Sequence, residues 1–244
     1  MPQNKSILVT GATSGVGLAI TNQLLAQNFD VIAIGRNDSI LQQLEKKGAE
    51  VFKVDLLNDA AVHEFTNKVR EVDVAILNAG VGIFEYAHLI EDDAIDDMIT
   101  LNISSQMKLT KALIPKVKQQ FIYIGSQAGK VATPKAAVYA ATKHALIGYT
   151  NGLRLEQPNL IITIVHPGPI DTPFLDYADA TGSYRGKMKN VLLSSEKVAE
   201  KTISLIGKNK RELNIPWYMG ITSKLYAVAP ALTEKIGKPF FYKK

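Results

Sequence analysis

The sequence contains no cysteine, which excludes disulfide bonds and thiolate metal sites. Its four histidines lack the spacing of metal ligands, so we predict no metal site; they are His63, His88, His144 and His166. No stretch reaches the ~18 consecutive apolar residues of a membrane-spanning helix. The first residues form neither an apolar signal region nor an Arg-rich transit segment. We therefore expect no integral membrane contact and a cytoplasmic location.

Charge of one sign is in only modest excess, with 28 Lys and Arg against 23 Asp and Glu and a net charge of +5. The basic residues form no run and no helical stripe, so we predict no nucleic-acid partner. The chain also lacks an internal repeat and a linker. Because 46% of its residues are hydrophobic, it can bury a full core. We expect residues 1–244 to form a single domain.

Short apolar runs alternate with amphipathic stretches along the chain. Strands are expected at residues 5–10, 30–35, 51–55, 73–78, 120–125, 160–165 and 212–215. Helices are expected after residue 17 and at 39–47, 58–70, 92–118, 138–155 and 196–206. This alternation indicates a parallel sheet covered on both faces, and the right-handed crossover rule makes it doubly wound. The expected fold class is a Rossmann-like α/β domain of about seven strands.

A glycine-rich turn, G-x-x-x-G-x-G, joins the first strand to the first helix through Gly11, Gly15 and Gly17. Glycines let a backbone approach phosphates, and the helix N-terminus offers free N–H groups and a positive dipole end. The turn therefore suits a pyrophosphate, although a plain strand-to-helix turn remains the alternative.

The end of the second strand carries the signal for the choice of nucleotide. A carboxylate there accepts the 2′-hydroxyl of NAD, whereas an arginine accommodates the 2′-phosphate of NADP. The strand ends in Gly35 and is followed by Arg36, which favours NADP. Asp38 would repel a phosphate, but we expect it to cap the next helix instead.

Tyr139 and Lys143 are four residues apart and therefore share one face of a predicted helix. A nearby cation favours the ionised form of a tyrosine, so Lys143 is expected to lower the pKa of Tyr139. A tyrosine placed in this way exchanges a proton with an alcohol oxygen. The pair alone is weak support, because both residue types are common on helix surfaces.

Together these motifs resemble the short-chain dehydrogenase/reductase family in kind, order and spacing over nearly the whole chain. The turn of residues 10–17 is similar to the family's T-G-x-x-x-G-x-G, and Asn78-Ala79-Gly80 to its N-A-G motif. The resemblance implies an NADP(H) site formed by Gly11, Thr13, Ser14, Gly15, Val16, Gly17, Arg36, Asp55, Leu56, Asn78, Ala79, Gly80, Tyr139, Lys143, Pro167, Gly168, Ile170 and Thr172.

The resemblance also implies a catalytic tetrad of Asn102, Ser126, Tyr139 and Lys143. Tyr139 would protonate the carbonyl oxygen, and Ser126 would hydrogen-bond it. Lys143 would lower the pKa of Tyr139 and bind the ribose of the cofactor. Asn102 would hold a water molecule that links Lys143 to solvent. The implied activity is NADP(H)-dependent interconversion of a carbonyl and an alcohol by hydride transfer, in a homodimer or homotetramer.

The predicted substrate contacts are Ser126, Gln127, Tyr139 and Phe174. Residues 168–194 are expected to form a flap over the site that contains one short helix, and residues 216–244 an apolar C-terminal extension. The extension is expected to bury its apolar face against the flap, a second subunit or a membrane surface. A redox sensor that binds NADP without turnover is the alternative function, and the intact pair of Tyr139 and Lys143 speaks against it.

Overall fold

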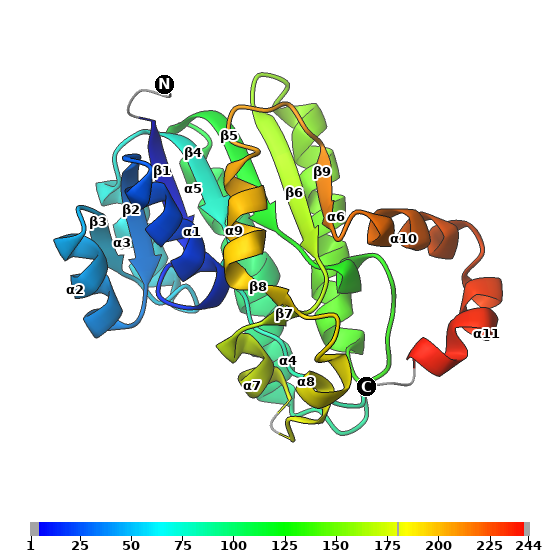
Figure 1. Ribbon diagram of the computed structural model, residues 1–244. Coiled ribbons are helices and arrows are strands. Elements are labelled where there is room, and N and C mark those ends of the chain that lie inside the picture. Colours follow the sequence, from blue (N-terminus) through cyan, green and yellow to red (C-terminus); the bar gives the residue numbers. More distant parts are fainter. Residues whose placement is uncertain (1–4, 180, 242–244) are drawn as a thin grey trace.

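The computed structural model describes residues 5–179 and 181–241, with side chains through residue 237, around a central parallel sheet (Figure 1). Its seven strands lie in the order β3-β2-β1-β4-β5-β6-β9. They are β1 (Ser6–Thr10), β2 (Asp30–Gly35), β3 (Glu50–Lys53), β4 (Val72–Leu77), β5 (Val117–Ile124), β6 (Ile161–Pro167) and β9 (Glu212–Ile215). Every neighbouring pair is parallel. The predicted fold class is confirmed.

Helices cover both faces of the sheet (Figure 1). The core under one face contains side chains of α1 (Gly15–Ala26), α2 (Asp38–Lys46) and α9 (Ser195–Ile203). The core under the other face contains side chains of α3 (Asp59–Lys68), α5 (Ser105–Leu113) and α6 (Ala137–Glu156). Strand β1 serves both cores, because Ile7 and Val9 point to the first and Leu8 to the second. A strand buried on both faces explains why its sequence is continuously apolar.

The predicted helix over residues 92–118 is wrong in two respects. It is divided into α4 (Asp92–Ile99), a π-helical turn (Thr100–Ser104) and α5, which ends at Leu113. Residues 114–116 form a turn that contains Pro115, and β5 begins at Val117. Proline has no N–H to donate and its ring crowds the preceding turn, so the helix ends before it.

The flap and the C-terminal extension both lie at the C-terminal ends of the strands (Figure 1). The flap holds two short helices, α7 (Pro173–Ala178) and α8 (Ser183–Met188). It also holds a two-stranded sheet of β7 (Ile170–Asp171) and β8 (Leu193–Ser194), where one short helix was expected. The extension forms α10 (Tyr218–Val228) and α11 (Pro230–Phe241), which we call the C-terminal hairpin. Among the described residues, no helix has the length and apolarity needed to cross a bilayer.

Candidate active site

The C-terminal ends of β1, β4, β5 and β6 border a cavity of about 1150 Å³. Open α/β sheets bind ligands at this edge. Most of the predicted site residues line it, namely Gly11, Ser14, Gly15, Val16, Arg36, Asn78, Ala79, Gly80, Ser126, Gln127, Tyr139, Lys143, Pro167, Gly168, Ile170, Thr172 and Phe174. Thr13, Gly17, Asp55, Leu56 and Asn102 do not line it. Among the described residues, no cluster of side chains has the composition of a metal site.

The glycine turn is shaped by two left-handed residues and one close contact. Gly11 and Gly15 have φ angles of 64° and 48°, which favour glycine. A Cβ atom at Gly17 would lie 2.1 Å from the carbonyl oxygen of Gly11, so Gly17 lets α1 begin directly against the turn. The N–H groups of the first turn of α1 have no partner within the helix. They are suited to an anion at this end of the cavity.

Gly35, the last residue of β2, lets the turn after β1 pack directly against this strand. A Cβ atom at this position would lie 2.3 Å from Cγ2 of Thr13, so a side chain does not fit. Thr13 does not line the cavity, and its side chain packs on Gly35 instead. Arg36, the next residue, lines the cavity and places Nη1 3.7 Å from Oδ2 of Asp55, with both side chains largely exposed.

The expected cap of α2 is wrong. Asn37, one residue earlier, accepts from the N–H of Ile40 at 3.1 Å through Oδ1. Asp38 is the first residue of the helix and pairs with Lys53 at 2.6 Å. The positive charge of Lys53 thus offsets the negative charge of Asp38, which lies two residues after Arg36.

Leu57, rather than Asp55 or Leu56, lines the cavity after β3. Oδ1 of Asp55 accepts from the N–H of Leu57 at 3.1 Å, which turns the chain and brings Leu57 forward. Leu56 is buried, and its carbonyl accepts the hydroxyl of Ser105. An Asp that accepts a hydrogen bond from the N–H two residues later is a common turn signature. This signature at Asp55 could have predicted that Leu57 lines the cavity.

Tyr139 and Lys143 are both buried on α6 and face the cavity. Burial raises the pKa of Tyr139 to about 12, against the effect of a hydrogen bond with Ser126. This direction is opposite to the expected one. Lys143 Nζ lies 5.8 Å from the centre of the Tyr139 ring and donates to the carbonyl of Ile124 at 3.2 Å. Burial lowers the pKa of Lys143 to about 8.

Ser126 follows β5 and caps the 3-10 turn Gln127–Gly129, where its Oγ accepts from the N–H of Ala128 at 3.1 Å. The hydroxyl hydrogen therefore remains available to a second acceptor. Gln127 also lines the cavity, but its amide nitrogen donates away from Tyr139, to the carbonyl of His166 at 2.9 Å and to Oδ1 of Asn214 at 3.0 Å.

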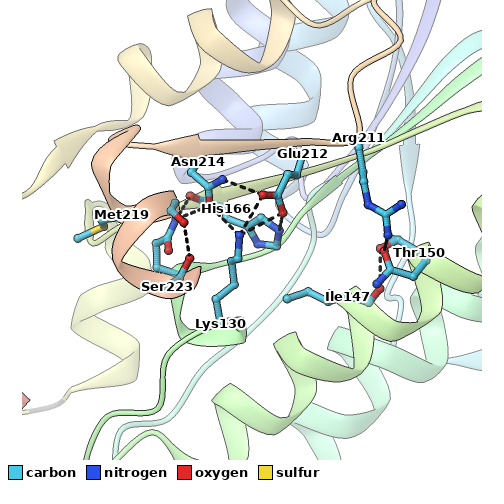
Figure 2. A network of polar contacts seen from close by, with 12 residues as sticks. Lys130, Ile147, Thr150, His166, Arg211, Glu212, Asn214, Met219 and Ser223 are labelled. Atoms are coloured by element: carbon cyan, nitrogen blue, oxygen red, sulfur yellow. Dashed lines mark hydrogen bonds and ion pairs between the residues drawn. The ribbon is translucent and has the colours of Figure 1, made fainter. Parts of the chain in front are cut away.

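A partly buried polar network lies next to this segment, as Figure 2 shows. Lys130 Nζ is 3.1 Å from both carboxylate oxygens of Glu212 and 3.2 Å from Oδ1 of Asn214. Nδ1 of His166 is 3.3 Å from the carbonyl of Ser126. Burial, followed by the charge of Lys130, lowers the pKa of His166 to about 4. His166 is thus neutral near pH 7, and its 3.7 Å contact with Glu212 is not an ion pair there.

Asn102 is fully buried in the π-helical turn, behind the cavity. Its Oδ1 accepts from the N–H of Val81 at 2.9 Å. Its Nδ2 donates to the carbonyl of Val81 at 2.8 Å and to Oγ1 of Thr142 at 3.0 Å. Asn102 therefore ties the loop after β4 to the helix that carries Tyr139. Its proposed water-holding role stays a prediction.

Two aromatic rings lie close to the ring of Tyr139. The ring centre of Tyr139 is 6.0 Å from that of Phe84 and 5.7 Å from that of Phe174. Phe84 in turn lies 5.1 Å from Tyr184. A Cβ atom at Gly82 would lie 2.7 Å from the Phe174 ring, so this glycine allows the rings to come together. Phe174 was among the predicted substrate contacts.

The segment after β6 completes the cavity near the glycine turn. The N–H of Gly168 donates to the carbonyl of Ile215 at 2.7 Å, which ties it to the end of β9. The side chain of Thr172 packs on Gly15, where a Cβ atom would lie 3.3 Å from Cγ2 of Thr172.

The chain is similar to known proteins in both sequence and fold. The family model described as "short chain dehydrogenase" matches residues 5–182. A mouse protein, dehydrogenase/reductase SDR family member 7B, is 30% identical over 96% of this chain and 80% of its own length. A 3beta-hydroxysteroid dehydrogenase of Mediterraneibacter gnavus is 30% identical over 84% and 83%. A structure of serine dehydrogenase with NADP+ is 27% identical, with a TM-score of 0.80 over 86% of this chain and 93% of that one.

Proposed function

Because the chain belongs to the short-chain dehydrogenase/reductase family, we propose that it is an NADP(H)-dependent oxidoreductase that interconverts a carbonyl and an alcohol, with Tyr139 as the general acid and base. The observation that carries the proposal is the joint placement of Ser126, Tyr139 and Lys143 in one cavity with the glycine turn. A relative named as a hydroxysteroid dehydrogenase supports the choice of a hydroxyl-bearing substrate.

The residues present fit a dinucleotide. The close approach at Gly17 leaves the start of α1 free for a pyrophosphate, and Lys143 offers a buried cation to the same cavity. Arg36 stands where a 2′-phosphate is accommodated, and no carboxylate replaces it. The solved relative that carries NADP+ supports the same choice. When bound, the reduced cofactor supplies the hydride.

The chain's own residues handle the proton and the charge on oxygen. A raised pKa keeps Tyr139 protonated near pH 7, which is the form that donates a proton to a carbonyl oxygen. Ser126 has one hydroxyl hydrogen to offer to the same oxygen and so stabilises its developing charge. The ammonium of Lys143 adds a positive charge nearby. The rings of Phe84 and Phe174 give Tyr139 apolar neighbours.

Substitution of Tyr139 by Phe tests the proposal. The variant keeps the ring but loses the proton donor, so turnover of carbonyls with NADPH should fall by about 10²–10⁴-fold. Binding of NADPH, followed by its fluorescence, should change little. Tyr149→Phe is a matched control on the same helix outside the cavity lining. Near-normal turnover by Tyr139→Phe would show that another group supplies the proton.

The redox-sensor alternative predicts a different outcome: NADPH binds, but no aldehyde, ketone or alcohol is turned over by the wild-type protein.

We further propose that residues 1–244 act as one domain, since the single seven-stranded sheet draws its strands from residues 6–215. A homodimer or homotetramer, and a cytoplasmic location, stay predictions. Light scattering of the full chain measures the first of these.

A further inference from the structure

The cavity does not end at Tyr139 but continues to the C-terminal hairpin. Helix α10 contributes Tyr218, Met219, Thr222, Leu225 and Tyr226 to its lining, and α11 contributes Thr233, Ile236 and Gly237. These residues line the same cavity as Ser126 and Tyr139. A molecule that reacts at Tyr139 therefore has a continuous path to the hairpin.

The hairpin is attached to the body of the protein at defined points. The sulfur of Met219 lies 3.0 Å from the position of a Cβ atom at Gly168, so α10 packs on the segment after β6. The hydroxyl of Tyr226 donates to Glu234 at 2.8 Å and joins the two helices. Tyr226 also has a hydrogen bond with the backbone of Ala132. The hairpin thus forms a wall of the cavity in the folded chain.

Among the described side chains, the flap and the hairpin bring no charged group to this lining. The charged residues that line the cavity are Arg36, Asp97 and Lys143, which come from the end of β2, from α4 and from α6. Arg185 of the flap is ion-paired with Asp171 at 2.7 Å and with Asp176 at 2.9 Å. Within the described lining, an anionic group beyond Tyr139 would therefore meet aromatic and aliphatic side chains and no cation, which is costly.

Part of this apolar lining is exposed to water. Leu225 and Ile236 line the cavity, yet their side chains are 58% and 71% exposed. Tyr177 of the flap and Tyr218 of the hairpin are exposed lining residues as well. Covering such an apolar surface with an apolar molecule is favourable, because it removes apolar area from water.

We propose that the substrate is an uncharged carbonyl compound with an extended apolar body, which reaches from Tyr139 to Leu225 and Ile236 on the C-terminal hairpin. The identity of the reacting group rests on the proposed function, whereas the apolar body rests on the lining alone. The cavity volume of about 1150 Å³ exceeds the roughly 300–1,000 Å³ of ordinary small-molecule sites, which leaves space for a cofactor and such a body together.

A series of methyl ketones from butan-2-one to decan-2-one, reduced with NADPH, tests the proposal. Each buried methylene should raise kcat/KM about fourfold until the chain reaches the hairpin. The anion 9-oxodecanoate, which has the same length as decan-2-one, should react at least about tenfold more slowly because its carboxylate lies among apolar groups. Equal kcat/KM across the series, or faster reduction of the anion, would overturn the proposal.

Substitutions on the hairpin locate the effect. Leu225→Ser and Ile236→Ser should each lower the ratio of kcat/KM for decan-2-one to that for butan-2-one by about tenfold. Val228→Ser and Leu232→Ser are matched controls, because both residues are exposed on the same hairpin without lining the cavity. The controls should leave the ratio unchanged. An equal loss in the controls would assign the effect to a membrane or a second copy on the outer face, and would contradict the proposal.

Binding measured without turnover separates this proposal from the proposed reaction. Decan-2-ol should bind to the NADPH-saturated protein in a calorimeter, and Leu225→Ser should weaken that binding. If no ketone is reduced but decan-2-ol binds in this way, the reaction is wrong and the apolar site stands. If ketones are reduced at a rate independent of their length and decan-2-ol gives no heat, the reaction stands and the apolar site is wrong.

Discussion

At the scale of single residues, the candidate site consists of side chains that the fold brings together from separate segments of the chain. Tyr139, Lys143, Ser126 and Arg36 line one cavity because they follow strand ends or share one helix face. The close approach of Thr13 to Gly35 is invisible in a linear pattern, because it depends on how two loops meet. For the same reason the pKa of Tyr139 was predicted in the wrong direction: burial is a property of the fold.

Arg36 carries the residue-scale prediction. Arg36→Ala should raise the KM for NADPH by at least about tenfold at low salt and leave that for NADH almost unchanged, since a charge-assisted hydrogen bond contributes roughly 1.5–3 kcal/mol. Steady-state kinetics with both cofactors measure this. Lys46→Ala is the matched control, because it removes an exposed positive charge from the last turn of α2, outside the cavity lining. An equal rise for both cofactors would show that Arg36 does not discriminate between them. A side chain at position 35 is a poor test, because it would clash with Thr13.

At the scale of elements, strand and helix alternation was predictable and the interruption of one helix was not. The apolar pattern of residues 92–118 continues through Asn102, so periodicity alone reads it as one helix. The π-helical turn Thr100–Ser104 shifts the register at this point. Such turns often occur at functional sites, and here the turn directs a buried amide toward the loop after β4.

Asn102→Ala should lower the free energy of unfolding by about 1–3 kcal/mol, because it leaves the buried N–H of Val81 without its partner. Urea unfolding measures this loss. Ser104→Ala lies in the same turn, where the Ser104 side chain makes no cap hydrogen bond, and it should change the free energy by less than about 0.5 kcal/mol. If both variants have the same midpoint, Asn102 does not hold the loop to α6.

At the scale of the whole molecule, the polar network around His166 and Glu212 makes stability depend on pH. Burial holds the pKa of His166 at about 4, below its ordinary value of 6.5, so the unfolded chain binds the proton more readily. The contribution of His166 to the free energy of unfolding is therefore complete above pH 6.5, and it is lost as the pH drops toward 4. The carboxyl of Glu212 acts in the same sense, since Lys130 and its other partners outweigh burial and lower its pKa.

His166→Gln should flatten this dependence by up to about 1.4 kcal/mol per pH unit between pH 6 and 4.5. Urea unfolding at a series of pH values measures the slope. His63→Gln is the matched control on the exposed side of α3 and should keep the slope of the wild type. An unchanged slope in His166→Gln would mean that His166 does not take up the proton on unfolding.

The contact between α1 and α9 also matters while the chain is being synthesised. Helix α1 buries Ile20 and Leu24 in a core that α9 completes with Val198 and Ala199. At a synthesis rate of ~5–20 residues per second, the ~170 residues between the two helices take roughly ten to thirty seconds to emerge. During that interval the nascent chain presents the apolar side of α1 without its final cover. The first helix thus remains open to chaperones on the ribosome until the ninth has been made.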